Sequence, residues 1–168
     1  IALQERLKAM TKSMPPVDED YMRIITPDQQ EIGIPDLATE EGQALVEEHL
    51  EGVELLILDN LSSLLRNGRE NEAESWLPLQ TWLLSLRRRG ISVLVVHHAG
   101  KGGGQRGTSK KEDLLDTVIL LKRPEDYNAT AGSHFLVYYQ KARGFHGDDA
   151  KPFDARLETN SDGYVWSI

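Results

Sequence analysis

The sequence has no cysteine among its 168 residues, which excludes disulfide bonds and thiolate metal sites. It also lacks any apolar run near the roughly 18 to 20 residues that a membrane-spanning helix needs. Its first residues do not show the basic-then-apolar order of a secretion signal. We therefore expect a cytoplasmic protein that does not contact membranes.

Positive charge is also scarce, because the sequence has 19 Lys and Arg but 27 Asp and Glu, which gives a net charge of −8. This balance argues against a protein that coats nucleic acid with its whole surface, although a local basic site stays possible. A hydrophobic content of 39% and a charged content of 27% are ordinary for a globular chain. The length predicts a single domain over residues 1–168.

Two catalytic motifs are missing. The phosphate-binding pattern of Gly, four residues and Gly-Lys-Ser/Thr does not occur. The Gly-x-Ser-x-Gly turn of α/β hydrolases is absent too, which argues against a serine hydrolase of that type.

The first third of the chain predicts a helix, a strand and a second helix. Apolar residues at helical spacing mark residues 1–14, and residues 21–26 have the composition of a short strand. Residues 27–38 contain two prolines and a glycine, which favour a loop. Thr39 has the hydroxyl of a helix cap, and Gly52 ends the helix that follows.

The remainder alternates strand and helix before it turns to strands alone. Residues 53–58 and 91–96 are apolar on both faces, as buried parallel strands are, and a helix from about Ser75 to Arg89 separates them. Pro78 is tolerable there if it falls in the first turn. Two further strands are expected over residues 114–121 and 134–140 and a hairpin turn at 160–163. The pattern predicts an α/β fold: a parallel sheet with helices on both faces and antiparallel strands at its C-terminal edge.

Polar residues follow the two apolar strands. Leu55-Leu56-Ile57-Leu58-Asp59 has the form of a Walker B strand, and a carboxylate at a strand end suits Mg²⁺. The alternative is an aspartate that caps the next turn. His97 and His98 end the other strand; neighbouring strand residues point to opposite faces, so joint chelation of one metal is geometrically poor. They are either sensors of a terminal phosphate or ordinary hydrogen-bonded histidines.

Positive charge concentrates in two places. The glycine-rich loop over residues 100–111 carries four cations and no acid, and its glycines allow close approach to a phosphate backbone. The alternative is a solvated loop. Lys141 and Arg143 end the strand over residues 134–140 and share a strand face, either as a charged edge or as a pair reaching a neighbouring subunit's phosphate site. The four loop cations are Lys101, Arg106, Lys110 and Lys111.

Four segments in this order resemble the RecA-like core of hexameric replicative helicases of the DnaB and plasmid RepA type. They are LLILDN (55–60), VLVVHHAGKGGG (93–104), RGTSKKEDLLDTVILLKR (106–123) and YYQKARG (138–144). Together they span a little over half of the chain. The resemblance implies that the chain is part of the RecA-like P-loop NTPase core of an ATP-dependent DNA helicase that acts in DNA replication.

The resemblance also implies roles for single residues. Asp59 corresponds to the acid that holds Mg²⁺ through water, and with Asn60 and His98 it would bind ATP, His98 sensing the γ-phosphate. Lys141 and Arg143 correspond to the pair inserted into the adjacent subunit's ATP site of a homo-oligomeric, hexameric ring. The four loop cations correspond to the loop that grips single-stranded DNA. Asp113 and Asp116 correspond to structural residues before the next strand.

The departures from the family pattern are as informative. Its Walker A loop and its catalytic glutamate both precede these segments, and neither is present. We therefore expect a fragment of the core that does not hydrolyse ATP alone, because the β- and γ-phosphates lack a cradle. Two alternatives share the fold: a recombinase or KaiC-like ATPase, and a non-catalytic module for DNA binding or assembly.

Overall fold

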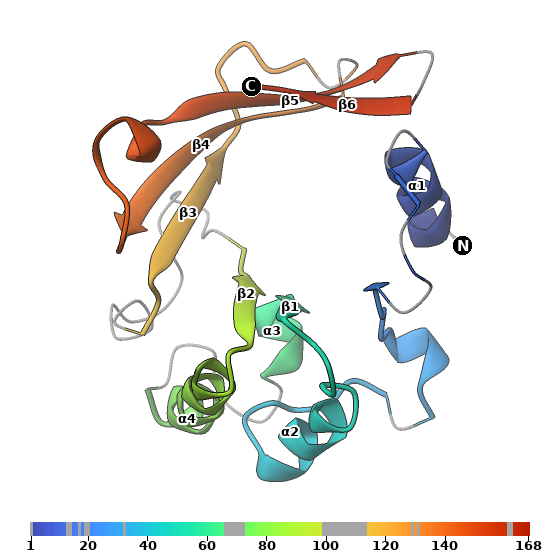
Figure 1. Cartoon of the computed structure of the whole chain (residues 1–168), viewed down its shortest axis with the longest axis vertical. Helices are drawn as coiled ribbons and strands as arrows, with labels where there is room; N and C mark the ends of the chain where they lie inside the picture. Colours follow the sequence, from blue (N-terminus) through green and yellow to red (C-terminus); the bar gives the residue numbers. More distant parts are fainter. Residues whose placement is uncertain are drawn as a thin grey trace. The chain divides into compact units, whose positions relative to one another are not determined.

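The computed structural model describes residues 2–12, 15–16, 18, 21–31, 33–65, 73–98, 114–128, 130, 132–160 and 163–168. The chain divides into two compact units, whose helices and strands are labelled in Figure 1. The first unit contains Ile1–Arg23 and Leu115–Ile168, and the second contains Ile24–Leu114.

The second unit is built on two parallel strands, β1 (Leu55–Asp59) and β2 (Ser92–Val96). Leu55 pairs with Ser92 and Asp59 pairs with Val96, so the two strands are in step along their whole length. Three helices accompany them (Figure 1): α2 (Glu40–Glu47), α3 (Leu61–Leu64) and α4 (Ala73–Arg88). Both predicted parallel strands are therefore present, within two residues of the expected bounds.

One face of this parallel pair packs on a hydrophobic core, and the other does not. Leu58 is buried, and Leu56, Val93 and Val95 pack against the buried cluster. Leu55, Ile57 and Leu94 on the opposite face are 53%, 51% and 48% exposed. Burial on both faces was therefore a wrong prediction for this unit, because period-2 alternation sends every second apolar side chain away from the helices. The cluster's buried members are Leu37, Leu50, Leu58, Leu61, Leu65, Trp76, Leu79, Trp82, Leu83, Leu86 and Ile91.

Helix α2 begins where the capping pattern predicts. The Thr39 hydroxyl accepts a hydrogen bond from the Gly42 amide at 3.1 Å, which satisfies one of the free N–H groups of the first turn. Gly42 is buried, and a Cβ at this position would clash with the carbonyl of Asp36. The residue is therefore glycine for steric reasons.

Helix α4 starts earlier than the sequence predicts. It begins at Ala73, so Pro78 lies in the second turn and not in the first. An interior proline removes one backbone hydrogen bond and costs about 3 kcal/mol. Burial offsets this cost, because each of the buried side chains on α4 contributes roughly 1.5–3 kcal/mol. These are Trp76, Leu79, Trp82, Leu83 and Leu86.

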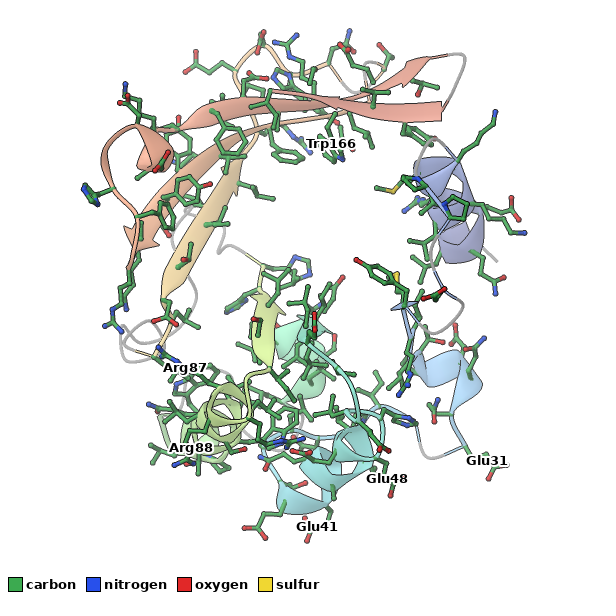
Figure 2. The ribbon with its side chains drawn as sticks, in the orientation of Figure 1. Glu31, Glu41, Glu48, Arg87, Arg88 and Trp166 are labelled. Carbon is green, nitrogen blue, oxygen red and sulfur yellow. The ribbon has the colours of Figure 1, made fainter. Side chains whose placement is uncertain are left out.

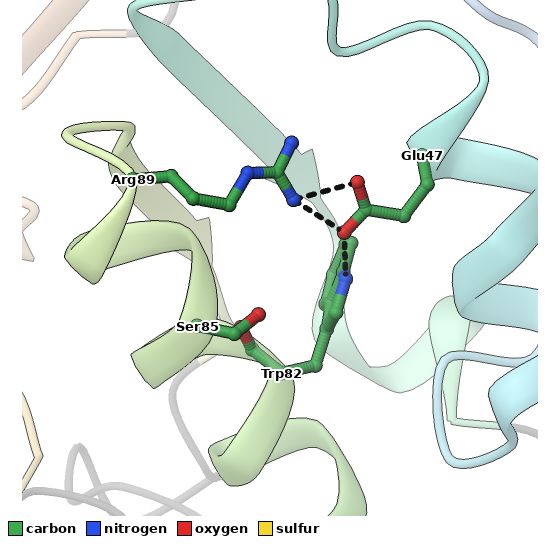
Figure 3. Close-up of polar contacts among 4 residues, drawn as sticks. All are labelled: Glu47, Trp82, Ser85 and Arg89. Atoms are coloured by element: carbon green, nitrogen blue, oxygen red, sulfur yellow. Dashed lines mark hydrogen bonds and ion pairs between the residues drawn. The ribbon is translucent and has the colours of Figure 1, made fainter.

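The Glu47 carboxylate links α2 to α4 through hydrogen bonds (Figure 3). Glu47 accepts a hydrogen bond of 2.7 Å from the Trp82 indole and two, of 2.9 and 2.7 Å, from Nη1 of Arg89. Burial alone raises the pKa of Glu47, but hydrogen bonds from Arg89 and Trp82, with the charge of Arg89, outweigh it and hold the pKa below 4.5. The ionised form is therefore the one that the fold stabilises.

We expect Glu47→Gln to lower the free energy of unfolding by about 1–2 kcal/mol, because two charge-assisted partners lose their anion at a partly exposed site. A carboxyl whose pKa falls on folding stabilises the protein above its unfolded pKa, and that stability is lost as the pH falls through the lower folded pKa. Urea unfolding between about pH 7 and about pH 3 measures both effects.

Glu48→Gln is the matched control, since Glu48 is the exposed neighbouring residue and points away from the helix in Figure 2. The loss for Glu47→Gln should shrink toward zero as the pH falls through the lowered folded pKa of Glu47, because the wild-type carboxyl then becomes protonated as well. Equal stability of the two variants at neutral pH would show that the Glu47 contacts add nothing.

The first unit is an antiparallel sheet in the order β3-β4-β5-β6, with strands β3 (Thr117–Lys122), β4 (Ser133–Ala142), β5 (Phe153–Asn160) and β6 (Gly163–Ser167). Helix α1 (Ala2–Thr11) contacts β6 (Figure 1), and the 3-10 turn η5 (Gly147–Ala150) precedes β5. A bulge interrupts the β3–β4 ladder between Val118 and Ile119. Val118, Val137 and Ala155 are buried, and the Trp166 ring (Figure 2) meets Phe135 edge-on at 5.5 Å.

A polar cluster links β4 to β5. The His134 ring hydrogen-bonds to Asp154 at 2.8 Å, and Nε of Arg156 donates to the other oxygen of Asp154 at 3.1 Å. The His134 bond lowers the pKa of Asp154 below 3.8; partial burial opposes it, and Arg156 supports it. The pairing of β4 with β5 is therefore reinforced by side chains as well as backbone.

Several sequence expectations differ from this architecture. Residues 21–26 form no strand, and Tyr21, Met22, Ile24 and Ile25 are exposed, because no strand pairs with them among the described residues. The parallel and antiparallel strands form two sheets in the described part of the chain, where one sheet with an antiparallel edge was expected. The C-terminal hairpin is confirmed by the pairing of Asn160 with Gly163. Among the described residues, no helix is both long and apolar enough to cross a membrane.

Candidate functional site

Four polar residues lie at the carboxyl edge of the β1–β2 pair. Asp59 is the last residue of β1 and lies opposite Val96, the last residue of β2, so the segment after each strand leaves the sheet at the same edge. Asn60 follows β1, and His97 and His98 follow β2. In parallel α/β sheets this edge is where ligands bind.

Asn60 joins the two strand ends. Its Oδ1 accepts hydrogen bonds from the backbone N and the hydroxyl of Ser63, each at 3.1 Å, which caps the short helix α3. Its Nδ2 lies 3.2 Å from Nε2 of His98. A single amide therefore connects the end of β1, the start of α3 and the end of β2.

Exposure separates the members of this group. Asp59 and His98 are exposed, whereas Asn60 and His97 are half-buried. An exposed carboxylate can take a hydrated cation without losing much solvation, and an exposed imidazole can reach a ligand. His98 is the histidine whose Nε2 lies within hydrogen-bond distance of Asn60, and its role as a phosphate sensor stays a prediction.

The carboxylate of Asp59 fits a magnesium ion held in part by a nucleotide. Mg²⁺ prefers oxygen ligands, keeps several of its waters, and is commonly bound through one or two carboxylates together with phosphate oxygens. Asp59 supplies one exposed carboxylate at the sheet edge where phosphates would lie. A carboxylate oxygen is therefore a suitable Mg²⁺ ligand in its chemistry, and the binding of Mg²⁺ and ATP stays a prediction.

The second pair of predicted site residues belongs to the first unit. Lys141 lies opposite Val118 in the β3–β4 ladder. Arg143 follows β4, is exposed, and donates its backbone N–H to the Asp116 carbonyl at 2.8 Å. Gly144, with φ of 96°, then turns the chain in a conformation that favours glycine. This backbone bond does not involve the Asp116 side chain, so the structural role of Asp116 and the roles of Lys141 and Arg143 stay predictions.

The predicted DNA-binding cations lie outside the described residues. These are Lys101, Arg106, Lys110 and Lys111, and Asp113 lies outside them as well. A groove of about 460 Å³ is present on β5 and β6, and none of the predicted site residues lines it. Its lining residues are Asp154, Arg156, Glu158, Ser167 and Ile168.

The contact between Asn60 and His98 was not foreseen from the sequence. A local signal existed for half of it, because an asparagine directly before an apolar residue at the start of a helix indicates a cap. The other half joins residues 38 positions apart and depends on the pairing of β1 with β2.

Comparison with known proteins gives one family. The family model for an AAA domain matches residues 2–104, which is more than half of the chain. The matched range includes Asp59, Asn60 and His98 and ends before Arg106, Lys141 and Arg143. No curated protein matches this chain.

Proposed function

Since the chain belongs to the AAA domain family, we propose that it forms part of an ATP-dependent motor of the DNA-helicase type with a RecA-like P-loop NTPase core. The motor would couple ATP hydrolysis at subunit interfaces to movement along single-stranded DNA. The observation that carries this proposal is that Asp59 and His98 both lie at the carboxyl edge of two paired parallel strands, where Asn60, the residue after Asp59, contacts His98.

Within the proposed site, each side chain has a distinct task. Asp59 holds Mg²⁺ through water, and the ion neutralises charge on the β- and γ-phosphates. His98 donates a hydrogen bond to the γ-phosphate, so its environment differs between ATP and ADP. Asn60 contacts His98 after β2 and caps α3 after β1, and it thereby holds the ends of the two strands together.

Two further proposals complete the motor. Lys141, which is half-buried at the end of β4, and the exposed Arg143 insert into the ATP site of an adjacent copy in a hexameric ring, where a cation stabilises the charge of the transition state. The basic loop with Lys101, Arg106, Lys110 and Lys111 binds the phosphates of single-stranded DNA.

A nucleotide titration tests the site directly. We expect Mn²⁺, in place of Mg²⁺, to broaden the amide signals of residues 59, 60 and 98 of the ¹⁵N-labelled chain when a non-hydrolysable ATP analogue is added. Without a phosphate-binding loop the affinity should be weak, with a Kd on the order of millimolar. The His98 signal should respond to the analogue and much less to ADP.

Asp59→Asn is the matched variant, because it keeps the shape of the side chain and removes its charge. It should abolish the nucleotide-dependent broadening, since a neutral amide is a poor ligand for Mn²⁺. The amides of β4 serve as an internal control in the same spectrum. Broadening that needs no nucleotide, or that survives in Asp59→Asn, would count against this site.

A further inference from the structure

The orientation of the Asn60 amide is fixed by hydrogen-bond chemistry. The backbone N–H of Ser63 has only a proton to give, which it shares between the Asn60 backbone carbonyl and one end of the Asn60 side-chain amide, each at 3.1 Å. That end must therefore be the carbonyl oxygen, which also accepts the Ser63 hydroxyl at 3.1 Å. The NH₂ group is left for the opposite side.

The opposite side of Asn60 is the His98 ring. Nδ2 of Asn60 lies 3.2 Å from Nε2 of His98, and Nδ2 has only protons to donate. Nε2 must then be the acceptor, which it is only when it carries no proton. The single proton of the neutral ring is therefore on Nδ1.

We propose that Asn60 is a positioning residue that holds His98 in the Nδ1–H tautomer. This inference rests on the proposed function for its purpose: a γ-phosphate oxygen only accepts hydrogen bonds, so a histidine that senses it must present a donor. With Nε2 engaged by Asn60, the exposed ring presents Nδ1–H. Ser63 orients Asn60, and Asn60 in turn sets the proton on His98.

The consequence is a link between the two strand ends. Asn60 directly follows the proposed magnesium ligand Asp59, and it caps α3 through Ser63. A displacement of the β1 end on nucleotide binding or release would alter the Asn60–His98 contact. The tautomer of His98 would then respond to what Asp59 holds.

Two substitutions separate this role from simple helix capping. Serine and aspartate cap helices about as well as asparagine. Asn60→Ser therefore keeps the cap and removes the donor, whereas Asn60→Asp keeps the cap and replaces the donor with an acceptor. The control is Ser63→Ala, which removes one hydroxyl but leaves the backbone N–H that orients Asn60.

The experiment is a long-range ¹H–¹⁵N correlation spectrum of the histidine rings in the 168-residue chain without nucleotide, above about pH 7.5, where an ordinary imidazole is neutral. We expect His98 to show an unprotonated Nε2 and a protonated Nδ1 in the wild type and in Ser63→Ala. Asn60→Ser should give a mixture of tautomers, and Asn60→Asp should place the proton on Nε2. The ring signals of His49 and His134 should not change.

A protonated Nε2 in the wild type, or the same tautomer in Asn60→Asp as in the wild type, would overturn the proposal. A different result would contradict the proposed function alone. In that result His98 has the expected tautomer, but its signal responds equally to the ATP analogue and to ADP. If both hold, Asn60→Asp should lower the preference for the analogue over ADP about tenfold, the scale of one hydrogen bond to a charged group.

Discussion

Replacing Arg143 with alanine is expected to lower kcat for ATP hydrolysis at least about 1,000-fold in an assembly that contains a phosphate-binding loop, with little change in nucleotide affinity. A cation that acts on the transition state stabilises charge that the bound ground state does not yet carry. The backbone of Arg143 is held by the bond to Asp116 while the side chain is exposed, which suits a group presented to another molecule. Steady-state hydrolysis and equilibrium nucleotide binding measure the two effects separately.

Arg123→Ala is the matched control, since Arg123 is another exposed arginine of the same unit and lies over the Tyr127 ring at 4.4 Å. It should change kcat by no more than a few-fold. Loss of nucleotide binding in Arg143→Ala would contradict the assignment, because a group that acts on the transition state is not needed to hold the ground state.

A mixing experiment tests whether Arg143 acts on a neighbouring copy. Arg143→Ala and Asp59→Asn subunits should each be inactive alone. In a mixed ring, an Asp59 site on one subunit meets an intact Arg143 from the next, so part of the hydrolysis should return. Without any recovery, an action across a subunit boundary is excluded.

The double change Lys110→Ala and Lys111→Ala is expected to weaken single-stranded DNA binding about 10- to 100-fold at low salt, as two phosphate contacts are lost. The slope of log affinity against log salt should become shallower by about 0.7 for each lost contact, because fewer counterions are released. Fluorescence anisotropy with a labelled oligonucleotide over a range of salt concentrations measures both quantities.

The control removes the same charge elsewhere. Lys8 and Lys151 are exposed lysines, each within 4.0 Å of an acid on the same turn, and their replacement by alanine alters the net charge equally. This variant should keep the wild-type slope. A slope unaffected by the change at Lys110 and Lys111 would mean that the loop is solvated and does not bind DNA.

Local chemistry was enough to predict the elements that frame the site. The alternation of apolar strands with helices, the cap at Thr39 and the hairpin around residues 160–163 each depend on neighbours close in sequence, and each is present. The same sequence patterns gave wrong predictions for elements that depend on residues distant in the sequence. Residues 21–26 have the composition of a strand but have no strand beside them among the described residues. Pro78 lies deeper in α4 because burial of the helix outweighs the lost hydrogen bond.

The sequence by itself determined that one apolar strand ends at Asp59 and that another ends just before His97 and His98. It also determined that the cations at 101–111 and 141–143 concentrate positive charge on an acidic chain. Only the tertiary structure decided that β1 and β2 are parallel neighbours in step with one another, which brings His98 to Asn60. Strand pairing is set by backbone hydrogen bonds between distant segments and by the hydrophobic core that both strands pack on. The residues next to Asp59 or His98 do not predict either of these. The direction of the Asn60 amide depends on the nearby Ser63, whereas the approach of His98 to that amide depends on the pairing of β1 with β2.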